Sequence, residues 1–346
     1  MRRRIRRRIA TRAVKGIAFA GALAVALFAF VAHRHDSGAA RADGPISVQT
    51  ERIVFDPADP GRTRFGALVW RGGLRVTAPP PFGGISGLVL SADGGRLIAV
   101  TDNGNWVTAR LDYGDGNLGG LSDVVMTPIS GAAGERLRGK VDKDAEGLAF
   151  LGENELLVSF ERNHRIAQYR IDDEGRFGRA RYLPVPDAIA HLPDNRGIEA
   201  VGVLPGSDVV VAIAERALDS AGNHSGWLIA ADGGAEPFWV SRGDGFDITD
   251  LSFLPDGDLI LLERRYLPFL GGAFRLRRVE RGELGPGEVL RGRILFSADD
   301  AYTVDNMEGL AVHRGRNGET VLSLISDDNF SSAQSTLLLQ FAISEE

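Results

Sequence analysis

The sequence contains no cysteine, so the fold can use no disulfide bond, the protein has no thiolate chemistry, and no lipidated cysteine can anchor it. Its six histidines show no spacing typical of a metal site. A glycine-rich phosphate loop opening a helix and a nucleophile elbow are also missing. After residue 45 we find no helical periodicity, and the 44 glycines favour a chain of short strands and tight turns.

The first 42 residues differ from the rest of the chain. Seven arginines and Lys15 fall within the first 15 residues, and the apolar run Gly16–Ala32 follows. This order predicts a signal peptide, with Ala40-Arg41-Ala42 as a cleavage site, or an uncleaved helical membrane anchor with a tether. In both cases the positive-inside rule predicts that residues 43–346 are periplasmic or extracellular and meet the membrane only through this segment.

The two parts of the chain carry opposite charge. Residues 1–42 hold nine Arg, one Lys and one Asp, which leaves 30 basic and 45 acidic residues in the remainder, a formal charge of −15. Such an acidic domain argues against nucleic acid as a partner and is compatible with divalent cations. We expect residues 43–346 to form one domain that acts as a monomer on a small anionic substrate.

One hairpin pattern recurs along this domain. Ala145–Phe150 and Glu155–Phe160 are apolar runs of strand length, joined by turn residues and followed by a charged end. The pattern returns in Ile85–Gly104, Gly197–Arg216, Ile248–Arg265 and Asn306–Asn329. The polar residues that open the first strands lie 60, 53, 51 and 58 residues apart: Ser86, Glu146, Glu199, Asp250 and Glu308. This period, filled with β-patterned runs, predicts an all-β propeller of four-stranded blades.

The strands outside the five repeats decide the number of blades. Ile46–Phe55 alternates as an edge strand does, and Phe65–Trp70 and Leu74–Ala78 flank Arg71-Gly72-Gly73 as a hairpin with a glycine turn. Ser335–Ile343 is a last strand. Because propellers usually close by mixing N- and C-terminal strands in one blade, we predict five blades, or six if these strands form a further composite blade.

Acidic residues recur at the start of the first strand and at the end of the second strand of the hairpins. In an antiparallel hairpin, the start of the first strand and the end of the second lie at the same edge of the sheet. The second strands end in Asp102, Glu161, Glu215, Glu263 and Asp327, and three of these are followed by Arg162, Arg216 and Arg264. Radial symmetry would gather all of them around one axial opening. Crowded carboxylates titrate upward unless cations lie among them, so we expect a divalent cation, the arginines, or both.

These positions suggest roles in catalysis. We assign Asp102, Glu146, Glu199 and Glu308 as metal ligands, Asp250 or Glu161 as the general base, and Arg162, Arg216 and Arg264 as the groups that hold an anion. The plainer alternative is that each Glu-Arg pair joins neighbouring blades and has no part in chemistry. The basic residues form no dense cluster in the sequence, which argues against a substrate as highly charged as inositol hexakisphosphate.

The ordered motifs resemble a known family. They are Gly84-Ile85-Ser86-Gly87-Leu88, Thr101-Asp102-Asn103-Gly104, Asp144-Ala145-Glu146-Gly147-Leu148, Phe160-Glu161-Arg162-Asn163, Gly197-Ile198-Glu199-Ala200 and Asn306-Met307-Glu308-Gly309-Leu310. Over about residues 64–343 they are similar to the bacterial phytase-like proteins with esterase-like activity. That family is loosely related to the calcium-dependent β-propeller phytases. The resemblance implies a propeller, calcium as the cation, and metal-assisted hydrolysis of a phosphate or carboxylic ester.

Two other functions remain open at this point. A non-catalytic propeller could bind a protein, glycan or small ligand in the cell envelope, and Trp106, Tyr266 and Phe330 lie close enough to rim motifs to serve it. A metal-dependent lactone hydrolase could use the same carboxylates.

Overall fold

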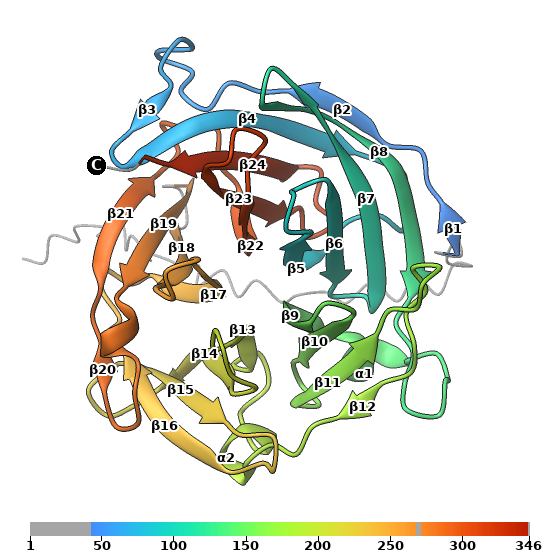
Figure 1. Cartoon of the computed structure of the whole chain (residues 1–346), viewed down its shortest axis with the longest axis vertical. Coiled ribbons are helices and arrows are strands. Elements are labelled where there is room, and N and C mark those ends of the chain that lie inside the picture. Colours follow the sequence, from blue (N-terminus) through green and yellow to red (C-terminus); the bar gives the residue numbers. More distant parts are fainter. Residues whose placement is uncertain (1–42, 268–270, 345–346) are drawn as a thin grey trace, which may run out of the picture. The chain divides into compact units, whose positions relative to one another are not determined.

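The computed structural model describes residues 43–267 and 271–344, which form five sheets arranged around a central axis (Figure 1). The predicted all-β propeller is confirmed. The signal peptide or anchor predicted for residues 1–42 lies outside the described residues. No helix within the described ranges is long and apolar enough to cross a membrane.

Each blade runs from an innermost strand at the axis to an outer strand. Blade one consists of β5 (Ile85–Leu90), β6 (Arg96–Thr101), β7 (Asn105–Gly114) and β8 (Asn117–Pro128), with β1 (Gly44–Pro45) at its edge. Blade two consists of β9 (Ala145–Gly152), β10 (Glu155–Phe160), β11 (Arg165–Arg170) and β12 (Arg181–Tyr182). Blade three consists of β13 (Ile198–Val203), β14 (Val210–Leu218), β15 (His224–Ile229) and β16 (Ala235–Val240), with β20 (Val289–Leu290) at its edge.

The last two blades follow the same order. Blade four consists of β17 (Asp247–Phe253), β18 (Leu259–Leu267), β19 (Gly271–Val279) and β21 (Arg293–Ala298). Blade five consists of β22 (Asn306–Arg314), β23 (Thr320–Asp327), β24 (Thr336–Ile343) and β4 (Leu68–Thr77), with β2 (Gln49–Arg52) and β3 (Arg64–Phe65) paired to β4. The helices are single turns: α1 (Gly139–Lys143), α2 (Asp187–Ala190) and the 3-10 helix η1 (Arg281–Glu283).

The ring closes through blade five. The N-terminal strand β4 pairs antiparallel with the C-terminal strand β24, so the two ends of the domain share one sheet (Figure 1). The predicted mixing of terminal strands is therefore confirmed. It completes the fifth blade, and the described residues form no sixth one.

The predicted hairpin around Arg71-Gly72-Gly73 is wrong, because β4 runs through these residues as one strand. The two glycines mark close approaches instead of a turn. A Cβ on Gly72 would lie 2.7 Å from the carbonyl oxygen of Leu118, and one on Gly73 would lie 2.6 Å from the ring of Trp70. Glycine inside a strand often marks a place where another part of the protein approaches the backbone closely. The sequence alone does not distinguish such a glycine from one in a turn.

Apolar packing between blades holds the ring together. The buried side chains form five clusters, and each joins residues of two neighbouring blades. The cluster between blades four and five is rich in aromatic rings: Phe55, Phe65, Trp70, Phe296, Tyr302 and Phe341. These rings pack where the N-terminal segment meets the last two blades, so aromatic contacts contribute to the closure of the ring.

A β-bulge interrupts the pairing of the two innermost strands in every blade. The residue after the bulge packs against the neighbouring blade. A Cβ on Gly87 would lie 2.5 Å from the carbonyl oxygen of Glu146, and one on Gly147 would lie 2.4 Å from that of Glu199. Glycine is required at these two positions because the adjacent innermost strands approach so closely, whereas blades three and four have Ala200 and Asp250 at the equivalent position.

Blade four also contains a buried charge cluster. Glu263 is fully buried, and its carboxylate binds the guanidinium groups of Arg275 and Arg277, which are themselves almost fully buried. The Nε of Arg275 lies 2.5 Å from Oε2 of Glu263. Removing one partner of such a cluster leaves uncompensated charge inside the protein.

We therefore expect Glu263→Gln to lower the free energy of unfolding by about 3–5 kcal/mol, because two buried guanidinium groups lose their counter-charge. Chemical denaturation followed by tryptophan fluorescence measures this. The control is Glu236→Gln, the same change at an exposed position on β16. Equal unfolding midpoints for the two variants would contradict the prediction.

Candidate functional site

Polar side chains gather at one end of the axis, around a cavity of about 250 Å³ that we call the mouth. Its fifteen lining residues are Ser86, Asp102, Lys140, Asp144, Glu146, Glu161, Arg162, Asn195, Glu199, Glu215, Arg216, Arg264, Glu308, Asp327 and Asn329. Eight of them are carboxylates and four are basic, which leaves a formal excess of four negative charges. The structure brings together all the predicted site residues except Asp250.

Strand register explains why the mouth is acidic. The bulge turns one residue of each innermost strand toward the axis: Ser86, Glu146, Glu199, Thr249 and Glu308. In each second strand, one residue pairs with the position just before the bulge, and the residue that follows it belongs to a second set: Asp102, Glu161, Glu215, Arg264 and Asp327. Because the same geometry repeats in every blade, nine of these ten residues line one cavity. The exception is Thr249, whose hydroxyl donates to the carbonyl oxygen of Met307 at 3.1 Å.

The expected role of Asp250 as a base does not fit its position. The structure buries Asp250 fully, and its carboxylate accepts hydrogen bonds from the backbone amides of Leu251 (2.8 Å) and Leu310 (2.6 Å). It thereby bridges blades four and five. In blade four the bulge residue is Thr249, one position earlier, because Ile248-Thr249-Asp250 occupies the positions that Ile198-Glu199-Ala200 holds in blade three.

The same one-residue offset applies to the second strand of blade four. Glu263 pairs with Ile248, at the position that Ala214 holds in blade three, so its side chain points away from the axis. Arg264 instead occupies the position that the carboxylate of Glu215 takes in the preceding blade. The expected ring of five carboxylates is therefore broken by one arginine.

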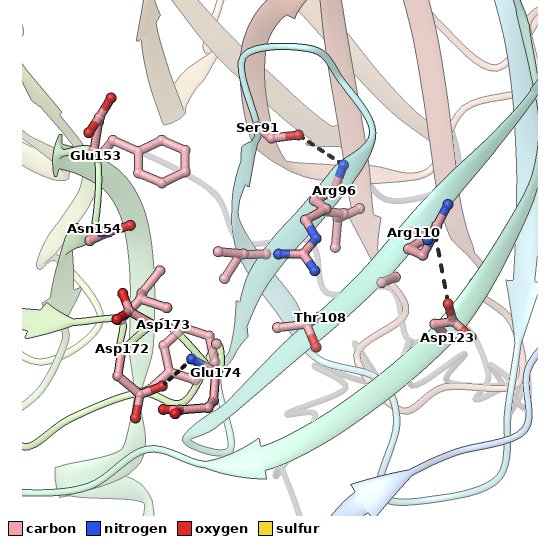
Figure 2. Close-up of a pocket in the computed structure, with 17 residues that line it drawn as sticks. Ser91, Arg96, Thr108, Arg110, Asp123, Glu153, Asn154, Asp172, Asp173 and Glu174 are labelled. Carbon is pink, nitrogen blue, oxygen red and sulfur yellow. Dashed lines mark hydrogen bonds and ion pairs between the residues drawn. The ribbon is translucent and has the colours of Figure 1, made fainter.

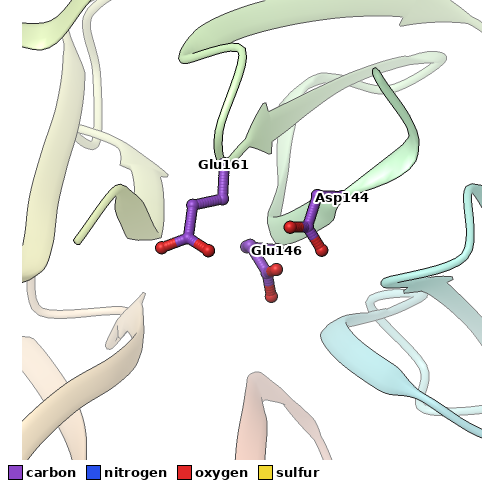
Figure 3. Close-up of side chains that lie close together, drawn as sticks. All are labelled: Asp144, Glu146 and Glu161. Carbon is purple, nitrogen blue, oxygen red and sulfur yellow. The ribbon is translucent and has the colours of Figure 1, made fainter. Parts of the chain in front are cut away.

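Three carboxylates come close enough to share one cation. Ligand oxygens of Asp144, Glu146 and Glu161 lie within 4.8 Å of one another, and Figure 3 shows their side chains converging. The site assignment from sequence missed Asp144, although it opens the motif that contains Glu146. Its carboxylate is held by Lys140 at 2.5 Å and by Nε of Arg162 at 2.6 Å.

Unlike Asp144, Glu146 and Glu199 have no basic partner. Within the described part of the chain, neither carboxylate makes a hydrogen bond or an ion pair, although both side chains are half-buried. By contrast, Oε1 of Glu161 accepts a hydrogen bond from the amide of Gly197 at 3.0 Å. Partly buried carboxylates without partners are costly, and a bound cation would remove that cost.

Burial and mutual repulsion raise the carboxyl pKa values in the mouth. Burial raises the pKa of Glu146 well above its usual range, and the negative charges of Glu199, Asp144 and Glu161 raise it further. Glu199 shows the same direction, with burial first and Glu215 next. Burial also raises the pKa of Glu308 to about 8 and that of Asp327 to about 7.

Two of the three mouth arginines, Arg216 and Arg264, join neighbouring blades as the plainer alternative expects, whereas Arg162 pairs with Asp144 of its own blade. Arg264 of blade four lies 3.1 Å from Glu215 of blade three and 3.1 Å from Glu308 of blade five. Arg216 lies 3.0 Å from Asp247 and is exposed at the rim. Arg264 is therefore committed to carboxylates, whereas Arg216 keeps an accessible guanidinium.

Backbone strain also concentrates at the mouth. Three of its lining residues that are not glycine have left-handed backbone conformations: Arg162 (φ 60°), Asn195 (φ 56°) and Asn329 (φ 48°). Such conformations cost free energy and persist where the surroundings fix them, as they often do at binding sites.

The aromatic residues considered for a binding propeller lie in different places. Trp106 is buried and stacks on Phe177 with ring centroids 4.1 Å apart, so it is not at the mouth. Phe330 is 47% exposed and follows the mouth residue Asn329. The side chain of Tyr266 lies outside the described residues.

A larger cavity of about 630 Å³ lies between blades one and two, at the strand ends opposite the mouth (Figure 2). Some of its charged residues are paired locally, as Arg110 is with Asp123 at 3.8 Å and Asp172 with Arg176 at 2.8 Å, and its unpaired carboxylates, Glu153 and Asp173, are exposed. Volume alone would favour this cavity. We place the candidate site at the mouth because the unpartnered carboxylates there are half-buried.

Fold and site together define a five-bladed β-propeller with an acidic axial mouth. The profile of the phytase-like family, described as "Esterase-like activity of phytase", matches residues 80–330. The chain belongs to this family, as its motifs predicted. No protein with a curated description matches the sequence.

Several solved structures are similar to the chain at low identity. A protein of unknown function from Dyadobacter fermentans has a TM-score of 0.44 and 14% identity, covering 86% of this chain and 91% of its own. A candidate gluconolactonase has a TM-score of 0.43 and 13% identity, covering 89% and 99%. Virginiamycin B lyase from Staphylococcus aureus has a TM-score of 0.36 and 10% identity, covering 84% and 74%.

The raised pKa values predict an unusual dependence of stability on pH. A carboxyl group with a raised pKa binds its proton more tightly in the folded state, so stability falls as pH rises from about 4.5 toward the folded value, near 8 for Glu308. Without divalent cations, the melting temperature should therefore be higher at pH 5.5 than at pH 8.5. Calorimetry in a chelator measures the difference.

The variant Glu146→Gln/Glu199→Gln should be more stable at pH 8.5 by about 1–2 kcal/mol, because it removes two repelling charges. This corresponds to a rise in melting temperature of roughly 2–6 °C. The exposed change Glu236→Gln serves as the control. The prediction of charge repulsion would be refuted if the parent protein melted at a higher temperature at pH 8.5 than at pH 5.5 and the double variant melted at the same temperature as the parent.

Proposed function

We propose that this chain is an exported, divalent-cation-dependent hydrolase of a phosphate or carboxylic ester, with calcium as the cation. The observation that carries the proposal is the pair of unpartnered carboxylates, Glu146 and Glu199, beside the converging oxygens of Asp144 and Glu161. Export is supported by the basic and apolar segments of residues 1–42, which have the order of a signal peptide or anchor.

The donor set fits calcium. Calcium binds six to eight oxygen atoms in flexible geometry, and the mouth offers only oxygen donors besides its basic groups. Asp144, Glu146 and Glu161 would hold the ion, with Glu199 beside them. With Glu308 protonated, as its pKa of about 8 implies near neutral pH, the eight carboxylates and four basic residues leave an excess of three negative charges, which one or two divalent ions would offset. A bound cation would polarise an ester oxygen and lower the pKa of water.

The remaining residues supply proton transfer. With Glu161 among the ligands and Asp250 outside the mouth, Glu199 is the carboxylate free to take a proton from attacking water. Glu308 is protonated near neutral pH because its pKa is about 8, so it can donate a proton to the leaving oxygen. Its carboxyl group is positioned by Nδ2 of Asn306 at 2.7 Å and by Nη1 of Arg264 at 3.1 Å.

Arginines orient the anionic part of the substrate in this proposal. Arg216 is exposed at the rim, and Arg162 keeps part of its guanidinium accessible. Planar guanidinium groups bind carboxylate and phosphate oxygens in pairs, which fixes orientation as well as charge. Arg264 contributes by holding Glu308 and is not expected to bind substrate directly.

Calcium binding is the first test. We expect calorimetry on the metal-free full-length chain to show saturable calcium binding, and Glu146→Gln or Glu161→Gln to weaken it at least about tenfold by removing a ligand. Hydrolysis of p-nitrophenyl phosphate or p-nitrophenyl acetate should require the ion and fall in parallel. Glu236→Gln should change neither quantity.

The outcomes of this test separate the candidate functions. Calcium binding without turnover of either ester would make the mouth a ligand-binding site and the protein a binding propeller. Absence of both would leave the carboxylates as blade-joining groups.

The raised pKa of Glu308 predicts how turnover depends on pH. Turnover should fall as pH rises through about 8, because Glu308 then loses the proton that it donates. Glu308→Gln should lower kcat by about 10²-fold to 10⁴-fold and abolish this limb, while the amide retains a contact with Asn306. Steady-state kinetics from pH 6 to 9.5 measure both effects. A variant with the parental pH profile would exclude Glu308 as the acid.

A further inference from the structure

Phe330 is an exposed aromatic residue at the rim of the mouth. It directly follows the mouth residue Asn329, and 47% of it is exposed. Its ring packs against two glycines, because a Cβ on Gly83 would lie 3.0 Å from Cδ1 of Phe330 and one on Gly84 would lie 2.7 Å from Cε2. The Cβ on Gly84 would also meet Oδ1 of Asp102. The ring therefore borders the mouth between blades five and one, beside Asp102.

The backbone of Phe330 is strained. Its φ is 51°, and that of Asn329 before it is 48°, so two consecutive residues that are not glycine adopt the left-handed conformation. A bulky side chain rarely takes this conformation because its Cβ then crowds the backbone. Such strain costs free energy, and it persists where the surrounding contacts fix it, often at sites of binding or catalysis.

Asp328 fixes the loop in this conformation. Its Oδ1 accepts hydrogen bonds from the backbone amides of Phe330 at 3.0 Å and of Gly84 at 3.3 Å. Its Oδ2 accepts one from the hydroxyl of Thr336 on β24 at 3.3 Å. One carboxylate thus joins the loop to blade one and to its own blade. The ring is therefore held at the rim before any ligand arrives, which lowers the entropic cost of binding.

Packing of the domain does not account for the ring. Phe330 belongs to none of the five apolar clusters that the described residues form between the blades. A strained aromatic residue that contributes to no core needs another explanation, and its place beside the mouth suggests contact with a ligand.

The proposed acid lies on the same blade as Phe330. Glu308 is on β22, which pairs with β23, and the loop that carries Phe330 follows β23. A group attached to the leaving oxygen at Glu308 can therefore extend over the rim of blade five. Blade one, on the other side of the ring, presents only one carboxylate to the mouth, Asp102, because Ser86 stands at its bulge position. This side of the mouth is thus more open to an apolar group than blades two and three are.

We propose that Phe330 binds an aromatic ring in the leaving group of the substrate, so that the substrate class is an ester of an aromatic alcohol. This rests on the proposed function, in which the scissile ester lies in the mouth. Two aromatic rings attract each other in stacked or edge-to-face pairs, in addition to the apolar surface that they bury. Phe330 is a specificity-determining residue in this proposal and takes no part in breaking the ester bond.

The test compares phenylphosphonate with methylphosphonate, which share one anionic group and differ in the ring. A phosphonate resembles both a phosphate ester and the tetrahedral intermediate of carboxylic ester hydrolysis, and neither probe contains an ester bond. Calorimetry on the calcium-loaded full-length chain should show that phenylphosphonate binds at least about tenfold more tightly. Phe330→Ala should reduce this preference to about twofold or less, by weakening the binding of phenylphosphonate alone.

Three further variants separate the ring from the backbone. Phe330→Tyr, which keeps the ring, should retain the preference. Phe330→Gly should lose it as Phe330→Ala does, yet melt at a higher temperature than Phe330→Ala, because only glycine adopts the left-handed conformation freely. Tyr182→Ala removes an aromatic residue that is 43% exposed on β12 of blade two, and it should bind both probes as the parent does.

This inference and the proposed function can fail separately. A preference for phenylphosphonate that depends on Phe330, in a protein that hydrolyses neither p-nitrophenyl ester, supports the ring site and refutes the hydrolase. Calcium-dependent turnover in a protein that binds the two phosphonates equally, or binds neither, overturns the ring site alone. A preference that survives in both Phe330→Ala and Phe330→Gly also overturns it.

Discussion

The close contact between neighbouring innermost strands is the constraint on which the rest of this structure depends. At the contact, Gly87 and Gly147 leave no room for a side chain, since a Cβ would lie about 2.5 Å from the next blade's backbone. The bulge beside each contact turns the preceding residue toward the axis. One packing requirement therefore produces both a tight ring and a set of side chains that face a common cavity.

The acidity of the cavity then has an energetic consequence. Apolar clusters between the blades supply the stability that allows eight carboxylates to be held around a small volume. Arg264 offsets part of the repulsion by joining Glu215 and Glu308, and Lys140 and Arg162 do the same for Asp144. Among the described mouth carboxylates, Glu161 and Asp327 accept only backbone hydrogen bonds, and Glu146 and Glu199 have no partner at all, so the carboxylates without any partner lie on blades two and three.

Much of this arrangement could be predicted from the sequence, because the period of the hairpins and the acidic residues at their ends are visible in it. Closure through both termini also followed from a general rule for propellers. The offset at Asp250 and Glu263 is missed when the acidic residues of the repeats are aligned, because the structural repeat aligns Ile248 with Ile198 and therefore Thr249 with Glu199. The arginine-lined cavity at the junction of blades three and four could not be predicted, because Arg216, Arg242 and Arg265 are scattered along the chain and meet only when the two blades pack side by side.

Blade four differs from the other blades in the residues that it contributes to the mouth. The bulge position and the strand end carry acids in blades two, three and five, whereas blade four carries Thr249 and Arg264. Among the described residues, mouth carboxylates without an ion pair lie on blades two, three and five, whereas the junction of blades three and four carries a cavity lined by Arg216, Arg242, Arg264 and Arg265. The mouth is therefore asymmetric, because blade four contributes a cation at the strand-end position where the other four blades contribute an acid.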